Sequence, residues 1–305
     1  MTATGSERAS DPTPGPRVAV LGTGTMGGAM ARNLLRAGLR VDAWDRTPEV
    51  AAPLAQAGVT VHRHPSQAVA HADVVITMLS DAAAATSVAV GQGMLQALAP
   101  EAIWAQMGTI GVQATQQLAA TAAGMRPDVR FVDAPVSGTR GPAEAGQLLI
   151  LASGPEQARE SLVPVFGAIG SKTMWLGAAG AGSRLKLVLN TWLAFLIEGI
   201  AESAALADTL GVDHQAFRDA VEGGPLGAPI ALIKLAKIDA GDESPDFSLR
   251  WATKDIDLAL AEVGEGTLPV AAAIDQRWNQ LVEAGLGQAD VSAARHGLSQ
   301  AIATS

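Results

Sequence analysis

The stretch Arg17-Val18-Ala19-Val20-Leu21-Gly22-Thr23-Gly24-Thr25-Met26-Gly27 decides the fold. Its first five residues form an apolar run that predicts a buried strand, and residues 28–37 continue as an Ala/Leu-rich helical segment. Between them lies a Gly-x-Gly-x-x-Gly turn, in the strand-to-helix context that binds dinucleotides. Gly22 permits the tight turn, Gly24 lets the backbone approach a pyrophosphate, and Gly27 allows close packing of helix on strand.

The N-terminus of the predicted helix offers free N–H groups to an anion, and Thr25 and Met26 of the turn before it are predicted cofactor contacts. A glycine-rich turn without a ligand is the alternative interpretation of this stretch. An acidic residue at the end of the second predicted strand, Asp45, lies 23 residues after Gly22, close to the spacing of a ribose-binding acid. The strand, the helix and this acid together favour a dinucleotide.

The residues after the second strand give conflicting indications about the ribose. Asp45 favours NAD, because a carboxylate accepts hydrogen bonds from a free 2′-hydroxyl. Arg46, followed by Thr47, favours NADP, because a guanidinium can clamp a 2′-phosphate with two hydrogen bonds. We predict a slight preference for NADP, with NAD as the alternative cofactor. Mutual neutralisation of Asp45 and Arg46 is the third interpretation.

The composition excludes several classes of protein. With 305 residues, of which 48% are hydrophobic and 17% charged, the chain can bury one large core or two smaller ones. A net charge of −9 without a Lys/Arg cluster argues against nucleic acid as a partner. The chain has no cysteine, so disulfides, zinc-thiolate sites and thiol nucleophiles are excluded, and a cytoplasmic location is expected. Small molecules are the expected partners.

Two segments that could suggest targeting do not fit it. Residues 102–125 are uncharged, but glutamines and glycines interrupt them, so we expect no spanning helix and no membrane partner. Residues 1–16 are polar and rich in Pro and Gly, and they predict a mobile tail rather than a signal peptide.

The order of the predicted elements indicates an α/β protein with a Rossmann-type, doubly wound, mostly parallel sheet. A glycine-rich hinge follows at 177–182, then one long interdomain helix and an all-α C-terminal domain. We predict a dinucleotide-binding domain over 17–180 and a helical substrate and dimerisation domain over 181–305. The predicted strands are 17–21, 41–44, 59–61, 73–79, 102–105, 130–132 and 148–152. The predicted helices are 28–37, 113–123, 156–166, 183–210, 214–222, 230–238, 251–263, 269–284 and 291–303.

A lysine stands out on the long predicted helix. Apolar residues surround Lys186 on nearly every face, so its amine either reaches out to solvent or is held away from water. Asn190 lies four residues later and therefore shares a helix face with Lys186. Desolvation lowers the pKa of a lysine towards neutrality, which suits a group that exchanges a proton with a carbonyl or alcohol oxygen.

These residues occur in an order that resembles the β-hydroxyacid dehydrogenase family, which includes 3-hydroxyisobutyrate dehydrogenases and glyoxylate/succinic semialdehyde reductases. The resemblance spans Arg17 to about Leu260. It rests on four motifs: Gly22-Thr23-Gly24-Thr25-Met26-Gly27, Asp133-Ala134-Pro135-Val136-Ser137-Gly138, the spaced Gly182, Lys186 and Asn190, and Lys254-Asp255.

The resemblance implies an NAD(P)-dependent enzyme with Lys186 as the catalytic acid/base and Asn190 as a hydrogen-bond donor to the substrate. Ser137 and the Gly138 backbone would hold a substrate carboxylate, and a homodimer or homotetramer is expected. It also assigns cofactor contacts to the loop residues Leu79, Ser80 and Thr109 and to Lys254, near the nicotinamide.

The chain departs from the family pattern after Ser137-Gly138, where Thr139-Arg140 replaces a second glycine. Arg140 could bind a distal carboxylate of a dicarboxylic semialdehyde, or it could be a solvated loop residue. The segment 107–111 around Thr109 also departs from the family pattern, as does Asp45, where an asparagine is usual in the NADPH-preferring branch.

Other polar and aromatic residues carry weaker indications. The five histidines are scattered, so no metal site is expected. Glu198 and Glu202 are predicted to face solvent or a second subunit. The aromatic side chains Trp192, Phe195, Phe247 and Trp251 are predicted to lie in the core, although the last two could wall the pocket.

The expected function is hydride transfer between a nicotinamide cofactor and a small carboxylate-bearing aldehyde, ketone or 3-hydroxy acid. An imine reductase is one alternative, because that class shares the architecture, and a catalytically silent dinucleotide-binding scaffold is another.

Overall fold

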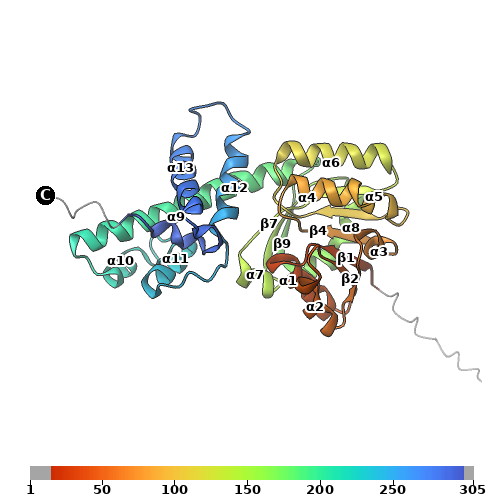
Figure 1. Cartoon of the computed structure of the whole chain (residues 1–305), viewed down its shortest axis with the longest axis horizontal. Coiled ribbons are helices and arrows are strands. Elements are labelled where there is room, and N and C mark those ends of the chain that lie inside the picture. Colours follow the sequence, from red (N-terminus) through yellow and green to blue (C-terminus); the bar gives the residue numbers. More distant parts are fainter. Residues whose placement is uncertain (1–14, 299–305) are drawn as a thin grey trace, which may run out of the picture.

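The structure is a computed structural model that describes residues 15–298. Two lobes lie side by side, one built around a sheet and one made of helices, and the long helix α9 runs from the first into the second (Figure 1). The predicted mobile tail over 1–16 lies outside the described residues, apart from its last two positions.

The larger sheet is entirely parallel and has the strand order β3-β2-β1-β4-β5-β6. The order reverses direction between β1 and β4, which is the switch point at which doubly wound sheets bind ligands. This confirms the predicted Rossmann-type architecture. The strands are β1 (Arg17–Leu21), β2 (Arg40–Trp44), β3 (Thr60–Val61), β4 (Val74–Thr77), β5 (Ile103–Gln106) and β6 (Arg130–Asp133).

Alternate side chains of β1 enter two different cores. Val18 and Val20 pack on one face with α1, α2 and α8, while Ala19 and Leu21 pack on the other with α3, α5 and α6. A parallel sheet covered on both faces requires such apolar strands. The helices of this lobe are α1 (Thr25–Arg36), α2 (Pro48–Gln56), α3 (Pro65–Val69), α4 (Ala82–Thr86), η1 (Ser87–Gly91), α5 (Met94–Ala97), α6 (Val112–Met125), α7 (Arg140–Glu144), η2 (Glu156–Ala158) and α8 (Arg159–Ile169).

A second, three-stranded sheet follows the first and corrects the sequence prediction. The predicted strand 148–152 is β8 (Leu148–Ala152), but it pairs with β7 (Val136–Ser137) and β9 (Gly170–Trp175) rather than with the main sheet. The pairing of β7 with β8 is antiparallel. The sequence did not predict β7 or β9, because the first has two residues and the second is a polar edge strand.

Helix α9 (Ala181–Leu210) is one unbroken helix of 30 residues, which begins two residues earlier than predicted. The helices after it confirm the predicted all-α region, except that a short 3₁₀ turn replaces the helix predicted over 291–303, whose last residues lie outside the described part. The elements are α10 (His214–Val221), α11 (Pro229–Ala240), α12 (Leu249–Leu260), α13 (Pro269–Glu283), η3 (Leu286–Gln288) and η4 (Val291–Arg295).

Two predictions about the sides of α9 are wrong. Trp192, predicted to be core, is 58% exposed, and Glu198, predicted to face solvent or a second subunit, is only 6% exposed within this chain. The Nε1–H of the buried Trp278 donates to Glu198 Oε2 at 2.7 Å, and Arg277 pairs with Oε1 at 3.2 Å. A buried indole needs an acceptor for its N–H, and Glu198 supplies it from the face of α9 that packs on α13.

No helix between residues 15 and 298 combines the length and the apolar character needed to cross a bilayer. Over the same residues, no three His, Asp or Glu side chains are placed to share a metal ion.

Candidate active site

The glycine turn lies at the carboxyl end of β1, where α1 begins. Gly22 has a φ of +90°, and a Cβ there would meet Met78 O at 2.4 Å. A Cβ on Gly27 would meet Gly22 O at 1.9 Å, so this glycine permits the helix to pack on the turn. A Cβ on Gly24 would meet no protein atom within 4 Å. The space above Gly24 is therefore open to a ligand.

A cleft of about 530 Å³ opens at this turn. Its walls combine the glycine turn, the end of β2 and the loop after β4, which leads into α4 and η1. The lining residues are Gly22, Gly24, Trp44, Asp45, Arg46, Met78, Leu79, Ser80, Asp81, Ala83, Ala84, Ser87, Val88 and Gln92. Four of the predicted cofactor contacts beyond the glycines thus share one cleft with the turn: Asp45, Arg46, Leu79 and Ser80.

The residues present fit a dinucleotide. The first N–H groups of α1, at Thr25 and Met26, have no intrahelical acceptor and belong to the same turn as Gly24. A helix N-terminus with an open glycine approach is the usual binding site for a pyrophosphate. No ion pair joins Asp45 and Arg46 among the described residues.

Lys186 lies in the second turn of α9 and is 9% exposed. No hydrogen-bond acceptor or ion-pair partner contacts its amine among residues 15–298. Burial lowers the pKa of Lys186 to about 8, the nearby ammonium of Lys254 lowers it further, and the carboxylate of Asp255 opposes both effects. Of the two possibilities left open by the sequence, the structure therefore favours the second, because most of the Lys186 side chain is buried.

Asn190 lies one helical turn after Lys186 and is also buried. Its amide Nδ2–H donates to Asp255 Oδ2 on α12. The other N–H and the amide oxygen are left without a partner among the described residues. A small cavity of about 10 Å³, lined by Asn190, Asp255, Phe247 and Trp278 among others, lies beside this pair. Phe247 packs partly in the core, as predicted, and forms one wall of this cavity.

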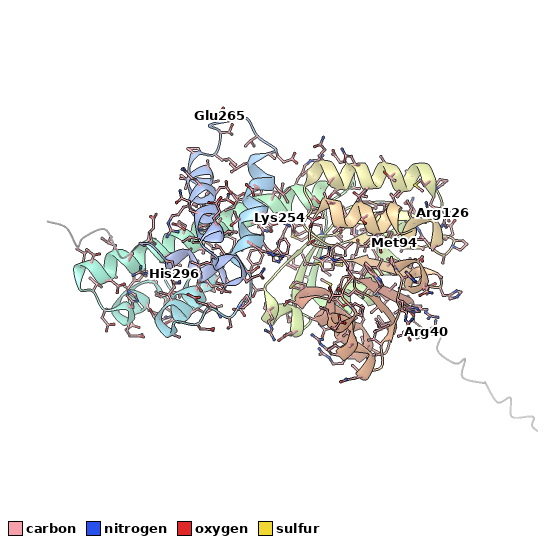
Figure 2. All side chains as sticks on the ribbon, in the orientation of Figure 1. Arg40, Met94, Arg126, Lys254, Glu265 and His296 are labelled. Carbon is pink, nitrogen blue, oxygen red and sulfur yellow. The ribbon has the colours of Figure 1, made fainter. Side chains whose placement is uncertain are left out.

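Lys254 connects the two lobes. Its ammonium donates to Ser80 O at 3.1 Å and to Thr109 O at 2.6 Å, and it pairs with Asp255 Oδ1 at 3.0 Å. The two carbonyls belong to the loops that follow β4 and β5. Figure 2 shows Lys254 where the helical lobe meets the sheet lobe. The loop residues of the cofactor cleft are thus joined through Lys254 and Asp255 to the surroundings of Lys186.

The predicted substrate-binding segment, residues 137–140, does not line the cofactor cleft. Ser137 ends β7, which lies against α9, and Gly138 has a φ of +135°. Thr139 precedes α7, whose first residue, Arg140, is exposed and pairs with Glu144 at 2.8 Å. The pKa of Arg140 is raised by its bond to Glu144 and, to a smaller degree, by Asp246 from the helical lobe.

One site residue was quoted in a motif but given no role from sequence. The buried carboxylate of Asp133 accepts hydrogen bonds from Gly180 N at 3.0 Å, Ser183 N at 2.8 Å, Ser183 Oγ at 2.7 Å and Ser153 Oγ at 3.0 Å. Burial raises the pKa of Asp133, while these donors favour its charged form. Asp133 therefore anchors the start of α9, one turn before Lys186. Only its position in the Asp-Ala-Pro-Val-Ser-Gly motif could have drawn attention to it.

A glycine turn on a parallel sheet, a cleft at the switch point and a buried amine between two lobes define a nicotinamide-dependent oxidoreductase. The comparisons agree. Residues 17–177 match the family described as the NAD binding domain of 6-phosphogluconate dehydrogenase, and residues 180–297 match the one described as NAD-binding of NADP-dependent 3-hydroxyisobutyrate dehydrogenase.

Two relatives cover nearly the whole chain. Glyoxylate/succinic semialdehyde reductase 1 of Arabidopsis thaliana is 33% identical over 90% of this chain and 96% of its own length. The solved structure of Mycobacterium tuberculosis 3-hydroxyisobutyrate dehydrogenase with L-serine is 30% identical and has a TM-score of 0.84. The match covers 93% of this chain and 99% of that one.

The chain belongs to the β-hydroxyacid dehydrogenase family, as its motifs predicted, and it is an NAD(P)-dependent oxidoreductase acting on CH–OH groups. A more distant similarity, to an imine reductase from Myxococcus stipitatus in complex with NADP+, has a TM-score of 0.64 at 21% identity over 92% of this chain and 98% of that one. At that identity the similarity concerns the fold alone.

Proposed function

We propose that this enzyme interconverts a small carboxylate-bearing aldehyde or ketone and the corresponding hydroxy acid, with Lys186 as the acid/base. The observation that carries the proposal is the buried Lys186 amine, which has no partner among the described residues and has a pKa of about 8. An amine that loses and gains a proton near neutral pH can serve both directions of the reaction.

Lys186 is the proposed proton donor in the reducing direction. Its ammonium gives a proton from Nζ to the carbonyl oxygen as that oxygen gains negative charge. In the oxidising direction the neutral amine takes the proton from the alcohol. Burial of the Lys186 side chain limits the access of water, which favours transfer of the proton to the substrate over loss to solvent. The bound nicotinamide supplies or accepts the hydride at the substrate carbon.

Two groups of residues are proposed to hold the substrate. Ser137 and the Gly138 N–H would bind its carboxylate, and the second N–H of Asn190 would donate to its oxygen. Since Asn190 is fixed by Asp255, its amide is oriented before the substrate arrives, which favours a reactive geometry. Thr139 and Arg140 would line the outer end, where Arg140 suits the distal carboxylate of a dicarboxylic semialdehyde.

The proposed cofactor site runs along the cleft described above. Gly22, Gly24 and Gly27, with the N–H groups of Thr25 and Met26, would hold the pyrophosphate. At the other end, Leu79, Ser80, Thr109 and Lys254 would lie beside the nicotinamide. These positions are supported by the bonds that join Lys254 to Ser80 O and Thr109 O.

We propose a preference for NADP over NAD that depends on Arg46. Its guanidinium lines the cleft and forms no ion pair among residues 15–298, so it can clamp a 2′-phosphate. Arg46→Ala should weaken NADPH binding by about tenfold, as expected for the loss of ~1.5 kcal/mol in a charged hydrogen bond, and leave NADH binding within twofold. Equal losses for both cofactors would contradict this preference.

A homodimer or homotetramer is proposed from the exposed side of α9. Val188, Trp192, Leu206 and Leu210 are each 58–67% exposed, and they recur along nearly the whole helix. A row of large apolar side chains in water is typical of a subunit interface. Trp192→Glu should therefore shift the mass measured by light scattering towards that of the monomer.

The division into a dinucleotide-binding domain over 17–180 and a helical domain over 181–305 also remains a proposal. It is supported by the change from sheet to helices at α9. A cytoplasmic location is proposed from the cysteine-free composition alone.

The deciding experiment is a panel of carbonyls and hydroxy acids, run with both reduced and both oxidised nicotinamides. Glyoxylate or succinic semialdehyde should be reduced far faster than a cyclic imine. Faster turnover of the imine would favour the alternative function, an imine reductase. Tight NADPH binding without turnover of any carbonyl would instead favour a silent scaffold.

A further inference from the structure

The carboxylate of Asp45 is already engaged within the protein. Its Oδ2 accepts hydrogen bonds from the backbone N–H of Thr23 at 2.7 Å and from Thr23 Oγ1 at 3.2 Å. Its Oδ1 accepts from the backbone N–H of Thr47 at 2.9 Å. Both oxygens of Asp45 are therefore used by the protein.

These donors belong to the two segments that frame one side of the cofactor cleft. Thr23 is the residue between the first two glycines of the turn and is 4% exposed. Thr47 is the residue that precedes α2. Asp45 itself follows β2, whose last residue, Trp44, accepts a hydrogen bond from Gly22 N at 2.9 Å. Asp45 thus ties the glycine turn, the end of β2 and the start of α2 together.

An ionised carboxylate offers about four acceptor positions, and three donors occupy those of Asp45, so one position on Oδ1 stays open. A ribose hydroxyl that approached the carboxylate from any other direction would compete for the existing bonds. If the carboxylate turned towards a ligand, the buried N–H of Thr23 would lose its acceptor, and an unpaired buried N–H is costly. Holding the turn and binding the ribose therefore oppose each other at this residue.

We propose that Asp45 is a positioning residue that braces the glycine turn, and that it does not bind the 2′-hydroxyl of the adenosine ribose. This inference rests on the proposed cofactor site. It resolves the conflict between Asp45 and Arg46 in the sequence, because the acid then selects neither cofactor. Discrimination at the 2′ position is left to Arg46 alone.

The first test uses the unmodified protein and two ligands, NADH and the analogue that lacks the 2′-hydroxyl of the adenosine ribose (2′-deoxy-NADH). Their Kd values are measured by calorimetry. Because the inference gives the 2′-hydroxyl no bond to Asp45, we expect the two Kd values to agree within twofold. A loss of tenfold or more for the deoxy ligand would overturn the inference. Failure of NADH and NADPH to bind at all would overturn the cofactor site as well, so the two failures are distinguishable.

The second test repeats the pair of ligands with Asp45→Asn. The amide keeps one acceptor but turns an N–H towards one of the two backbone donors, so the turn loses part of its brace. We expect both ligands to bind about fivefold more weakly, with an unchanged ratio between them. A change in that ratio of fivefold or more overturns the inference. So does a lower Tm with unchanged Kd values, because Asp45 would then support folding without positioning the turn.

Thr23→Val is the matched milder variant, because it removes the hydroxyl donor and keeps the backbone N–H. We expect it to weaken both ligands equally and by less than Asp45→Asn. An effect on NADH without an effect on 2′-deoxy-NADH would assign the ribose contact to this cluster and contradict the proposal.

Discussion

Two lysines are buried among residues 15–298, and their surroundings are opposite. Lys234 on α11 is 1% exposed, and its amine contacts both oxygens of Asp290, at 2.8 and 2.9 Å, and Asp246 at 3.5 Å. Lys186 on α9 is 9% exposed, and its amine has no such partner among residues 15–298. Asp255, the carboxylate whose charge raises the Lys186 pKa, is instead bonded to Asn190 and paired with Lys254.

The difference teaches that burial alone does not produce a reactive amine. Asp290 also accepts hydrogen bonds from Asp246 N, Phe247 N and Ser292 N, so Lys234 completes a fully bonded structural cluster. Burial opposes the ionisation of Asp290. The hydrogen bond from Lys234 and those from the backbone N–H groups nevertheless keep its pKa below the usual value. The desolvation of Lys186 is offset only in part, by the charge of Asp255, and its pKa falls to about 8. The buried amine that can exchange a proton near neutral pH is therefore that of Lys186, the lysine that lacks a partner.

The largest expected effect is on activity. Lys186→Met should lower kcat/KM for the best carbonyl substrate by about 100- to 10,000-fold, the usual contribution of a positioned acid/base. NADPH binding should stay within twofold. Lys172→Met on the exposed edge strand β9 is the control and should keep full activity. Substantial turnover by the Lys186 variant would remove the central argument for the mechanism.

The next largest effect is on stability, which substitution of the two lysines should change in opposite directions. Lys234→Met leaves the carboxylate of Asp290 buried without its cation, so the free energy of unfolding should fall by about 3–5 kcal/mol. Lys186→Met removes an unpaired buried amine and should leave stability unchanged or raise it. Urea unfolding at pH 7, with the same cofactor-free protein, measures both. Equal destabilisation by the two variants would show that the amines are held alike.

The contribution of Lys186 to the pH dependence of stability should be similar in size to these changes in the free energy of unfolding. Lys186 has a pKa of about 8 in the folded protein and 10.5 when unfolded, so the unfolded chain binds more protons between these values. The destabilisation by Lys186 is therefore complete below pH 8, at about 3 kcal/mol, and disappears as the pH rises towards 10.5. The stability difference between Lys186→Met and the unmodified protein should shrink over that range. A constant difference would contradict the low pKa.

The smallest effect concerns the tuning of Lys186 by Asp255. Because the Asp255 carboxylate opposes the lowering of the Lys186 pKa, Asp255→Asn should move the alkaline limb of carbonyl reduction to lower pH. The pH profile of kcat/KM is the measurement, with Asp257→Asn on the exposed side of α12 as the control. A profile displaced to higher pH would mean that Asp255 acts on the amine in some other way.

The sequence predicted most of the fold because its decisive patterns are local. The run 17–21 with the glycine turn predicted β1 and α1, and the uninterrupted apolar segment predicted α9. The same apolar character hid which side of α9 is buried, so Trp192 and Glu198 were assigned to the wrong sides. Only contact with Trp278, some 80 residues later, makes the Glu198 face the inner one.

The candidate site shows the same limit. Lys186 and Asn190 could be paired from their spacing on one helix, and the family resemblance supplied Ser137 and Lys254. The anchor role of Asp133 and the orientation of Asn190 by Asp255 could not be predicted, because these bonds join positions 50 and 65 residues apart. Position in a motif indicates that a residue matters, but the partner depends on the tertiary fold.

The unbroken course of α9 has a consequence for motion. The helix carries Lys186 near its start, where Asp133 binds it to the sheet lobe, and the packing surface of α12 and α13 farther along. A hinge ahead of the helix, at 176–180, would therefore have to break the bonds from Asp133 to Gly180 and Ser183. Separation of the two lobes would also have to break the bonds from Lys254 to two carbonyls.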